Sequence, residues 1–91
     1  MEEDIIPTPI QFDWDKGNSE KNWIKHKVTI KESEEIFFDR QVILIKSKKP
    51  IAKETRHIAF GTTNNDRKLT VVFTVRDDKV RIISARDQSK N

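Results

Sequence analysis

The sequence predicts an α+β fold in which two short N-terminal helices pack on an antiparallel β-sheet meander. A helix-start signal at Thr29 stands in the first half of the chain, and β-branched, alternating runs fill most of the second half. Short polar turns, Asn64-Asn65 and Asp77-Asp78, separate the later runs, as in a meander. This order of elements is typical of helices gathered against one antiparallel sheet.

The length allows one domain with a small core, because a chain of 91 residues buries a limited share of its surface on folding. Charged residues make up 36% and hydrophobic residues 34%, a balance that favours a folded domain over a disordered chain. Residues 1–9 carry Pro7 and Pro9 without periodicity and are predicted to form a tail. We therefore expect a single domain over residues 10–91.

The first elements of that domain are short. Apolar and polar residues alternate from Ile10 to Trp14, which predicts a brief half-buried strand. Asp15 is placed to cap a helix running to about Lys25, although Gly17 weakens its first turn. The second helix starts more clearly, since Thr29 and Glu32 have capping-box spacing, and it ends near Phe38.

The rest of the chain predicts strands. The expected segments are Val42–Ile45, Thr55–Phe60 ended by Gly61, Leu69–Val75 and Val80–Ala85. Residues 62–66 and Asp77-Asp78 form the expected turns, and a basic loop covers residues 46–53.

Alternation along these strands predicts two faces of the sheet. The face expected to pack on the helices carries Leu69, Val71, Phe73, Val75, Val80, Ile82 and Ser84. The opposite face carries Thr70, Val72, Thr74, Arg76, Arg81 and Ile83. One face is therefore apolar, and the other is amphipathic with cations.

Charge is divided between the two halves of the chain. Residues 1–40 hold six Lys/Arg against ten Asp/Glu, a net −4, whereas residues 41–91 hold twelve against five, a net +7. A basic half attracts polyanions at long range. From charge alone, the pattern is explained equally well if Lys and Arg merely make an exposed sheet soluble in water.

Several classes of chemistry are disfavoured. Without cysteine there is no disulfide or thiolate metal site, and the only glycines, Gly17 and Gly61, make no phosphate-binding loop. Asp13 and Asp15 could share one side of a strand end, but a helix cap beside an exposed acid explains them better than a metal site does. We expect no metal, no cofactor, no membrane segment and a cytoplasmic location.

RNA cleavage without a metal remains compatible with the sequence, because the attacking nucleophile is the substrate's own 2′-hydroxyl. The protein supplies a proton-transfer group and fixed cations, which suit histidine and arginine. The candidates are His26, His57, Arg56, Arg76, Arg81 and Arg86. Taken singly, each is explained as well by an exposed charge or a capping histidine.

A set of short motifs resembles the BrnT family, the toxins of bacterial type II toxin–antitoxin systems. The motifs are Phe12-Asp13-Trp14-Asp15, Asn22, Lys25-His26 with Val28, Phe37-Phe38-Asp39, Arg56 to Gly61, and Arg81-Ile82-Ile83-Ser84-Ala85-Arg86. Together they cover about residues 10–88, and their order and spacing are fairly specific.

The resemblance implies a RelE-like fold and an endoribonuclease that inhibits translation by cutting RNA. It also implies a BrnA-like antitoxin that neutralises the toxin and alone contacts operator DNA. The implied catalytic residues are Arg56 and Arg81 as phosphate-binding cations, His26 for proton transfer, and Arg86. The expected RNA contacts are Lys25, Arg76, Ser84, Lys48 and Lys49.

The sequence departs from the family pattern in three places. Lys27 stands where the family usually has glycine, which costs on the order of 1 kcal/mol if the backbone there is left-handed. Arg40 replaces a common proline, and the family's further basic, aromatic helix has no counterpart before Asn91. We therefore keep two alternatives: a non-catalytic RNA- or antitoxin-binding module, and a structural subunit whose basic face docks an acidic partner.

Overall fold

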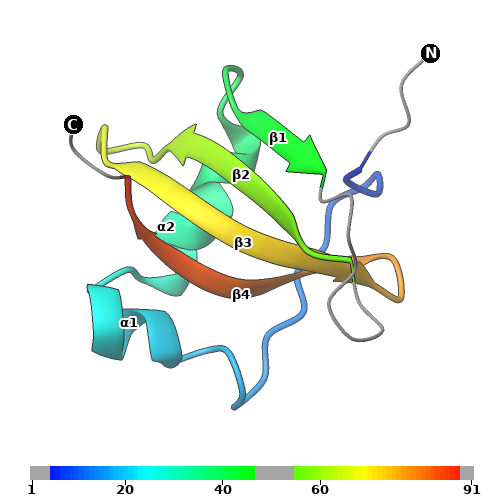
Figure 1. The fold of residues 1–91 in the computed structure, drawn as a ribbon, viewed down its shortest axis with the longest axis horizontal. Coiled ribbons are helices and arrows are strands. Elements are labelled where there is room, and N and C mark those ends of the chain that lie inside the picture. Colours follow the sequence, from blue (N-terminus) through cyan, green and yellow to red (C-terminus); the bar gives the residue numbers. More distant parts are fainter. Residues whose placement is uncertain (1–4, 47–54, 89–91) are drawn as a thin grey trace.

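Two helices and four strands follow one another along the chain in the computed structural model, which describes residues 5–46 and 55–88. The elements are α1 (Lys21–His26), α2 (Ile30–Glu35), the 3₁₀ turn η1 (Ile36–Phe38), β1 (Ile43–Lys46), β2 (His57–Thr62), β3 (Lys68–Arg76) and β4 (Lys79–Asp87). The strands form one antiparallel sheet in the order β1-β2-β3-β4 (Figure 1). The predicted α+β class and meander are confirmed.

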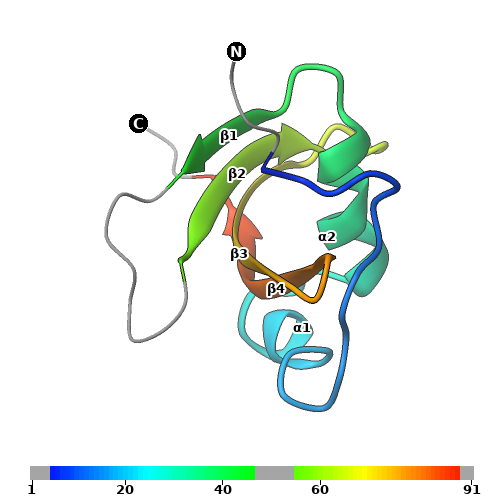
Figure 2. The ribbon, with the colours of Figure 1, turned by 90° about the vertical axis from the view of Figure 1, so that its right-hand side faces the viewer.

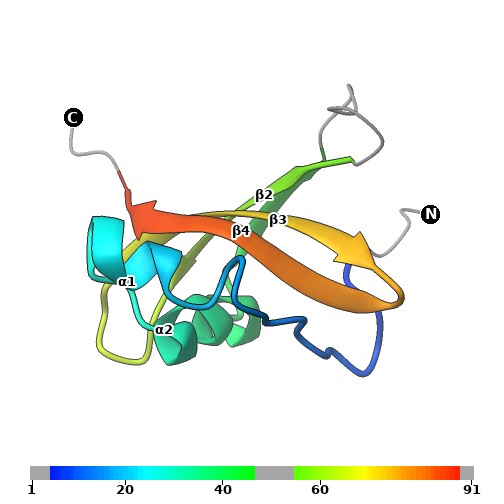
Figure 3. The same ribbon diagram turned by 90° about the horizontal axis from the view of Figure 1, so that it is seen from below.

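The helices lie on one face of this curved sheet, and among the described residues no helix covers the other face (Figures 2 and 3). The core lies between the sheet and α2. Its buried side chains are Val28, Ile36, Ala59, Leu69, Val71, Phe73, Val80, Ile82 and Ala85. Phe12, Trp14 and Phe37 pack against it from the helical side.

The start of α2 follows the sequence prediction. The Thr29 hydroxyl accepts a hydrogen bond from the Glu32 amide, and the Glu32 carboxylate accepts one from the Thr29 amide, so the capping box is complete. Such a cap satisfies amides that would otherwise lack partners and stabilises a helix by about 1 kcal/mol.

The prediction for α1 is wrong about its start. Residues 16–20 form turns, and α1 begins only at Lys21. The Asp15 carboxylate accepts a bond from the Gly17 amide at 2.7 Å, so it caps a local turn instead of a helix. Upstream, the expected strand reduces to an isolated parallel bridge between Phe12 and Val80.

Four non-glycine residues in the described ranges have positive φ and mark tight backbone positions. Asp77 and Asp78 form the two-residue hairpin between β3 and β4, where a type I′ turn needs positive φ at both positions. Lys27 ends α1 at φ 56°, ψ 39°, which confirms that this family-glycine position is left-handed here.

A β-bulge in β4 changes which residues share a face. Phe73 pairs with Ile82, but its neighbour Val72 pairs with Ser84, so Ile83 is the extra residue. The expectation that Ser84 joins the apolar core face is therefore wrong. Ser84 moves to the opposite face, and Ala85 becomes the buried residue.

The outer edge of β4 is covered by backbone and amide groups. The Val80 amide donates to the Gln11 carbonyl, and the Val80 carbonyl accepts from the Asp13 amide. The side-chain amide of Asn18 donates to the Ile82 carbonyl, and the side-chain oxygen of Asn22 accepts from the Ala85 backbone amide. These bonds fix residues 11–22 along β4 and so position the start of α1.

Candidate functional site

The face of the sheet opposite the helices is the surface that candidate functional residues share. We call it the open face. Alternation and pairing register place on it Ile43, Ile45, Ile58, Phe60, Thr70, Val72, Thr74, Arg81, Ser84 and Arg86. The middle of the open face is apolar, and its arginines, Arg81 and Arg86, lie toward the two ends of β4.

Arg56 joins this face at the end near the β3–β4 hairpin. It directly precedes β2, and its neighbour His57 points into the core against the Phe73 ring. Side chains alternate between the two faces of an extended chain, so Arg56 lies on the face opposite to that of its neighbour His57. Thr74 lies on that same face, because it follows Phe73, the partner of His57. Its Nε is buried and has no hydrogen-bond partner in the described structure.

Arg81 lies across from the same threonine. β3 and β4 pair Thr74 with Arg81, so the sheet register places Arg56 and Arg81 on either side of Thr74. The two arginines expected to bind phosphate therefore lie on the same face of the sheet, Arg56 directly before β2 and Arg81 on β4, the two strands that flank β3. This placement fits a shared anion site at the hairpin end.

Arg81 already has carboxylate partners. Its Nη1 and Nη2 bind the two carboxylate oxygens of Asp15 at 3.0 Å each, and Nη1 lies 3.5 Å from Asp13 Oδ2. The side chain of Arg81 is 16% exposed, whereas that of Asp15 is 57% exposed. The guanidinium is thus fixed in place by an acid that faces solvent.

The Arg81–Asp15 pair shifts both titrations. Hydrogen bonds from Arg81, and then from the Gly17 amide, hold the pKa of Asp15 below its usual value. The hydrogen bond to Asp15 raises the pKa of Arg81. Both groups therefore stay charged at neutral pH.

Arg86 marks the other end of the open face. It pairs with Thr70 and lines a groove with Ile58, Phe60, Thr70, Asp87 and Gln88. Phe60 and Arg86 lie on either side of Thr70 and line the same groove, an arrangement that suits an unpaired base and its phosphate. Ser84 lies between the two ends, opposite Val72.

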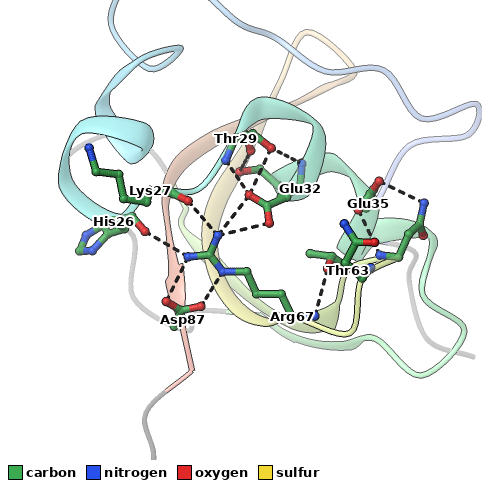
Figure 4. A network of polar contacts seen from close by, with 11 residues as sticks. His26, Lys27, Thr29, Glu32, Glu35, Thr63, Arg67 and Asp87 are labelled. Atoms are coloured by element: carbon green, nitrogen blue, oxygen red, sulfur yellow. Dashed lines mark hydrogen bonds and ion pairs between the residues drawn. The ribbon is translucent and has the colours of Figure 1, made fainter.

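His26 and Lys25 belong to the Arg86 end. The His26 carbonyl and the Asp87 carboxylate each accept a hydrogen bond from Arg67 Nη2 at 3.1 Å, so the end of α1 adjoins the end of β4 (Figure 4). The His26 imidazole points away from that guanidinium (Figure 4). Arg81 lies six residues back along β4, roughly 20 Å at the rise of a strand. The structure therefore does not bring His26 together with Arg56 and Arg81.

The remaining predicted contacts are scattered. Arg76 is exposed at the end of β3 and pairs with Lys79 beside the hairpin. Lys48 and Lys49 lie outside the described residues. His57 is buried on the core face, where burial, and then Lys46, lower its pKa.

Within residues 5–46 and 55–88, no three His, Asp or Glu side chains gather as a metal-binding group. None of the helices in the described ranges is long and apolar enough to cross a membrane.

A comparison with protein families shows the family of this chain. Residues 14–91 match the family described as the ribonuclease toxin BrnT of type II toxin–antitoxin systems. The chain belongs to the BrnT family. No match was found among curated proteins. A BrnT toxin acts within a toxin–antitoxin pair, so RNA targets and an antitoxin partner follow from family membership.

This BrnT chain also contains an organising residue that the sequence did not reveal. The Arg67 guanidinium donates to the carbonyls of His26 and Lys27 and to the carboxylates of Glu32 and Asp87 (Figure 4). It joins the end of α1, the cap of α2 and the end of β4. Arg67 follows a polar turn in the sequence, a position that gives no hint of four distant partners.

Two carboxylates of this network contribute to its strength. Burial alone would raise the pKa of Glu32, but hydrogen bonds from the Thr29 amide and from Arg67 lower it. The bond to Asp87, followed by the bond to Glu32, raises the pKa of Arg67. The network is therefore fully ionised at neutral pH, and it fixes the position of Lys25 and His26 on the BrnT surface.

Proposed function

We propose that this chain is a metal-independent endoribonuclease that inhibits translation by cutting RNA in the cytoplasm and is neutralised by a BrnA-like antitoxin. The observation that carries this proposal is the placement of Arg56 and Arg81 on either side of Thr74 on the uncovered face of a BrnT sheet. A RelE-like arrangement, a single domain over residues 10–91 and operator contact through the antitoxin alone belong to the same proposal.

The reaction needs only the RNA and the protein. The 2′-hydroxyl oxygen attacks the adjacent phosphorus, and the bond from phosphorus to the 5′ oxygen breaks. The hydroxyl proton is lost and the leaving oxygen gains one, which yields a 2′,3′-cyclic phosphate and a 5′-hydroxyl. Arg56 and Arg81 stabilise the negative charge that grows on the non-bridging oxygens.

Arg86 and its groove hold a flanking nucleotide in this proposal. Thr70 and Thr74 are four residues apart on β3, about 13 Å along the strand, so the groove lies beyond the linkage held by Arg56 and Arg81. Phe60 presents a ring on which a base can stack, and Ser84 contacts the RNA between the two ends of the open face. Further phosphate contacts along the RNA come from Lys25, Arg76, Lys48 and Lys49.

The His26→Gln variant locates the proton transfer. A loss of cleavage rate of about 100-fold or more would place the cut linkage at the α1 end, beside His26, and would contradict the placement of that linkage between Arg56 and Arg81. A loss of less than about threefold places the chemistry at the Arg56–Arg81 end, with the proton passing through solvent.

The direct test uses labelled single-stranded RNA with EDTA or with magnesium. The proposal predicts the same cleavage in both buffers and products that end in a 2′,3′-cyclic phosphate. RNA that stays intact in both buffers and on ribosomes refutes the nuclease proposal. Induction of the chain alone in bacteria should arrest growth, and co-expression of the antitoxin should restore it.

One observation favours a second function, a non-catalytic RNA- or antitoxin-binding module. Arg81 is paired with Asp15 and Asp13, and His26 lies far from it. Such a module binds RNA with a steep dependence on salt, because its phosphate contacts release counterions, and leaves the RNA uncut. The cleavage assay above separates the two functions.

A further inference from the structure

An apolar groove lies between α1 and α2, away from the open face. Trp23, Ile24 and Ile30 line it with 50%, 67% and 41% of their surfaces exposed. The polar residues Ser19, Glu20, Thr29 and Lys31 complete the lining. None of the three belongs to the buried core. Large apolar side chains gathered at one exposed site on a small domain mark an interaction surface.

Lysines are the main charged residues of the segment that forms this groove, although only Lys31 belongs to the lining itself. The segment from residue 16 to residue 31 carries Lys16, Lys21, Lys25, Lys27 and Lys31, all exposed, against the single acid Glu20. The Lys27 ammonium lies 5.0 Å from the centre of the Trp23 ring. Glu32, the next acid along the chain, is occupied by Arg67. The groove therefore combines apolar side chains with a positive rim.

We propose that this groove binds an acidic, amphipathic segment of the antitoxin protein. The inference rests on the proposed toxin function, which supplies the partner. Apolar side chains of the segment would cover Ile24, Ile30 and Trp23, and its carboxylates would face the lysine rim. Charge complementarity selects this occupant, because the five exposed lysines of residues 16–31 outnumber Glu20, the single acid of that segment, and so favour a partner with carboxylates.

Two other occupants fit less well. RNA would gain from the lysines and from the Trp23 ring, but Ile24 and Ile30 offer neither a stacking surface nor a hydrogen bond and would stay uncovered. A second copy meeting the groove through a two-fold axis would bring one lysine rim against the other, and like charges at an interface are unfavourable.

The position of the groove links partner binding to activity. Ile24 is followed directly by Lys25, which we expect to contact RNA, and by His26, the candidate for proton transfer. A protein segment seated on Ile24 would exclude the RNA strand from this end of the molecule. Antitoxin binding would thus act at the helices and obstruct the path of RNA beyond the Arg86 groove.

The test uses the full chain and the antitoxin encoded by the adjacent gene. Ile24→Asp should weaken antitoxin binding by about 30-fold or more in calorimetry, as for an interface hot spot. Phe38→Asp is the matched control, since Phe38 is 65% exposed on η1, outside the groove. It should change the dissociation constant by less than about threefold.

Each contrary outcome has a distinct meaning. Wild-type affinity for Ile24→Asp, or an equal loss for Phe38→Asp, overturns the docking proposal. So does a fall in RNA cleavage by Ile24→Asp in the absence of antitoxin, which would assign the groove to RNA. A dimer of the free chain that Ile24→Asp dissociates would assign it to a second copy. A wild-type chain that cleaves RNA but binds no neighbouring gene product overturns this inference and leaves the nuclease proposal standing.

Discussion

The guanidinium of Arg81 binds the Asp15 carboxylate through two parallel hydrogen bonds of 3.0 Å each. This two-point geometry is the one with which arginine binds phosphate. Asp15 is solvent-exposed, so a phosphate can approach the same edge of the sheet. If Arg81 binds RNA as we propose, the ion pair both orients the guanidinium beforehand and competes with the phosphate for it.

Replacing Arg67 by methionine should destabilise the fold by about 2 kcal/mol, because Glu32 and two main-chain carbonyls lose their charged donor while Asp87 is largely solvated. Urea denaturation measures the loss. Lys68→Met, at the exposed neighbouring position, is the control and should stay within about 0.5 kcal/mol of the wild type. Equal stability of both variants would refute the organising role of Arg67.

Gly61→Ala should destabilise the protein by about 2 kcal/mol through overpacking. A Cβ at residue 61 would lie 2.8 Å from Ile36 Cβ and 2.9 Å from the Ile36 carbonyl oxygen, neither of which can move freely. Gly17→Ala is the matched control, since its Cβ would meet the ends of Asp15 and Arg81 side chains at 3.1 and 3.3 Å. Thermal unfolding should show a clearly smaller shift for Gly17→Ala, and the reverse order would contradict the packing argument.

His57 should make stability depend on pH. Burial, then Lys46, lowers its pKa, so below its usual value of 6.5 the unfolded chain binds a proton that the folded chain refuses. The free energy of unfolding therefore falls as pH drops from about 7 toward the lowered pKa. His57→Gln should flatten this slope in urea denaturation from pH 7.5 to 5.5, whereas His26→Gln should keep it. A slope that persists in His57→Gln would assign it to other groups.

Arg56→Met should separate stability from function. The buried Nε of Arg56 has no partner in the described structure, so its removal should leave stability unchanged or raise it by about 1 kcal/mol. RNA cleavage should nevertheless fall by about tenfold or more, since one phosphate-binding cation is lost. A destabilised variant, or one that cleaves RNA normally, would contradict the assignment of Arg56 to the anion site.

Local patterns in the sequence were sufficient to predict much of the fold. The Thr29–Glu32 cap, the strand alternation of β3 and the Asp77–Asp78 hairpin depend on neighbouring residues, and all three are confirmed. The bulge at Ile83 was not predictable, because an extra residue in β4 leaves no trace in alternation. It is the reason that Ser84 lies on the open face.

The site was less predictable because its geometry depends on distant contacts. Residue types and the family resemblance identified Arg56, Arg81 and Arg86, but only the sheet register places two of them on either side of Thr74. The partners of Arg81 and Arg67 lie up to 66 residues away in the chain, and no spacing rule connects them.

The most direct test of the account is the RNA cleavage rate in EDTA of Arg81→Ala, Asp15→Asn and Arg40→Ala beside the wild type. Asp15→Asn breaks the ion pair but keeps the guanidinium, and Arg40 is an exposed arginine in the turn between η1 and β1. The proposed role of Arg81 predicts a loss of about 100-fold or more for Arg81→Ala in a folded protein, with both other variants within about threefold of the wild type. Unchanged cleavage by Arg81→Ala, or an equal loss for Asp15→Asn, would contradict a phosphate-binding role for Arg81.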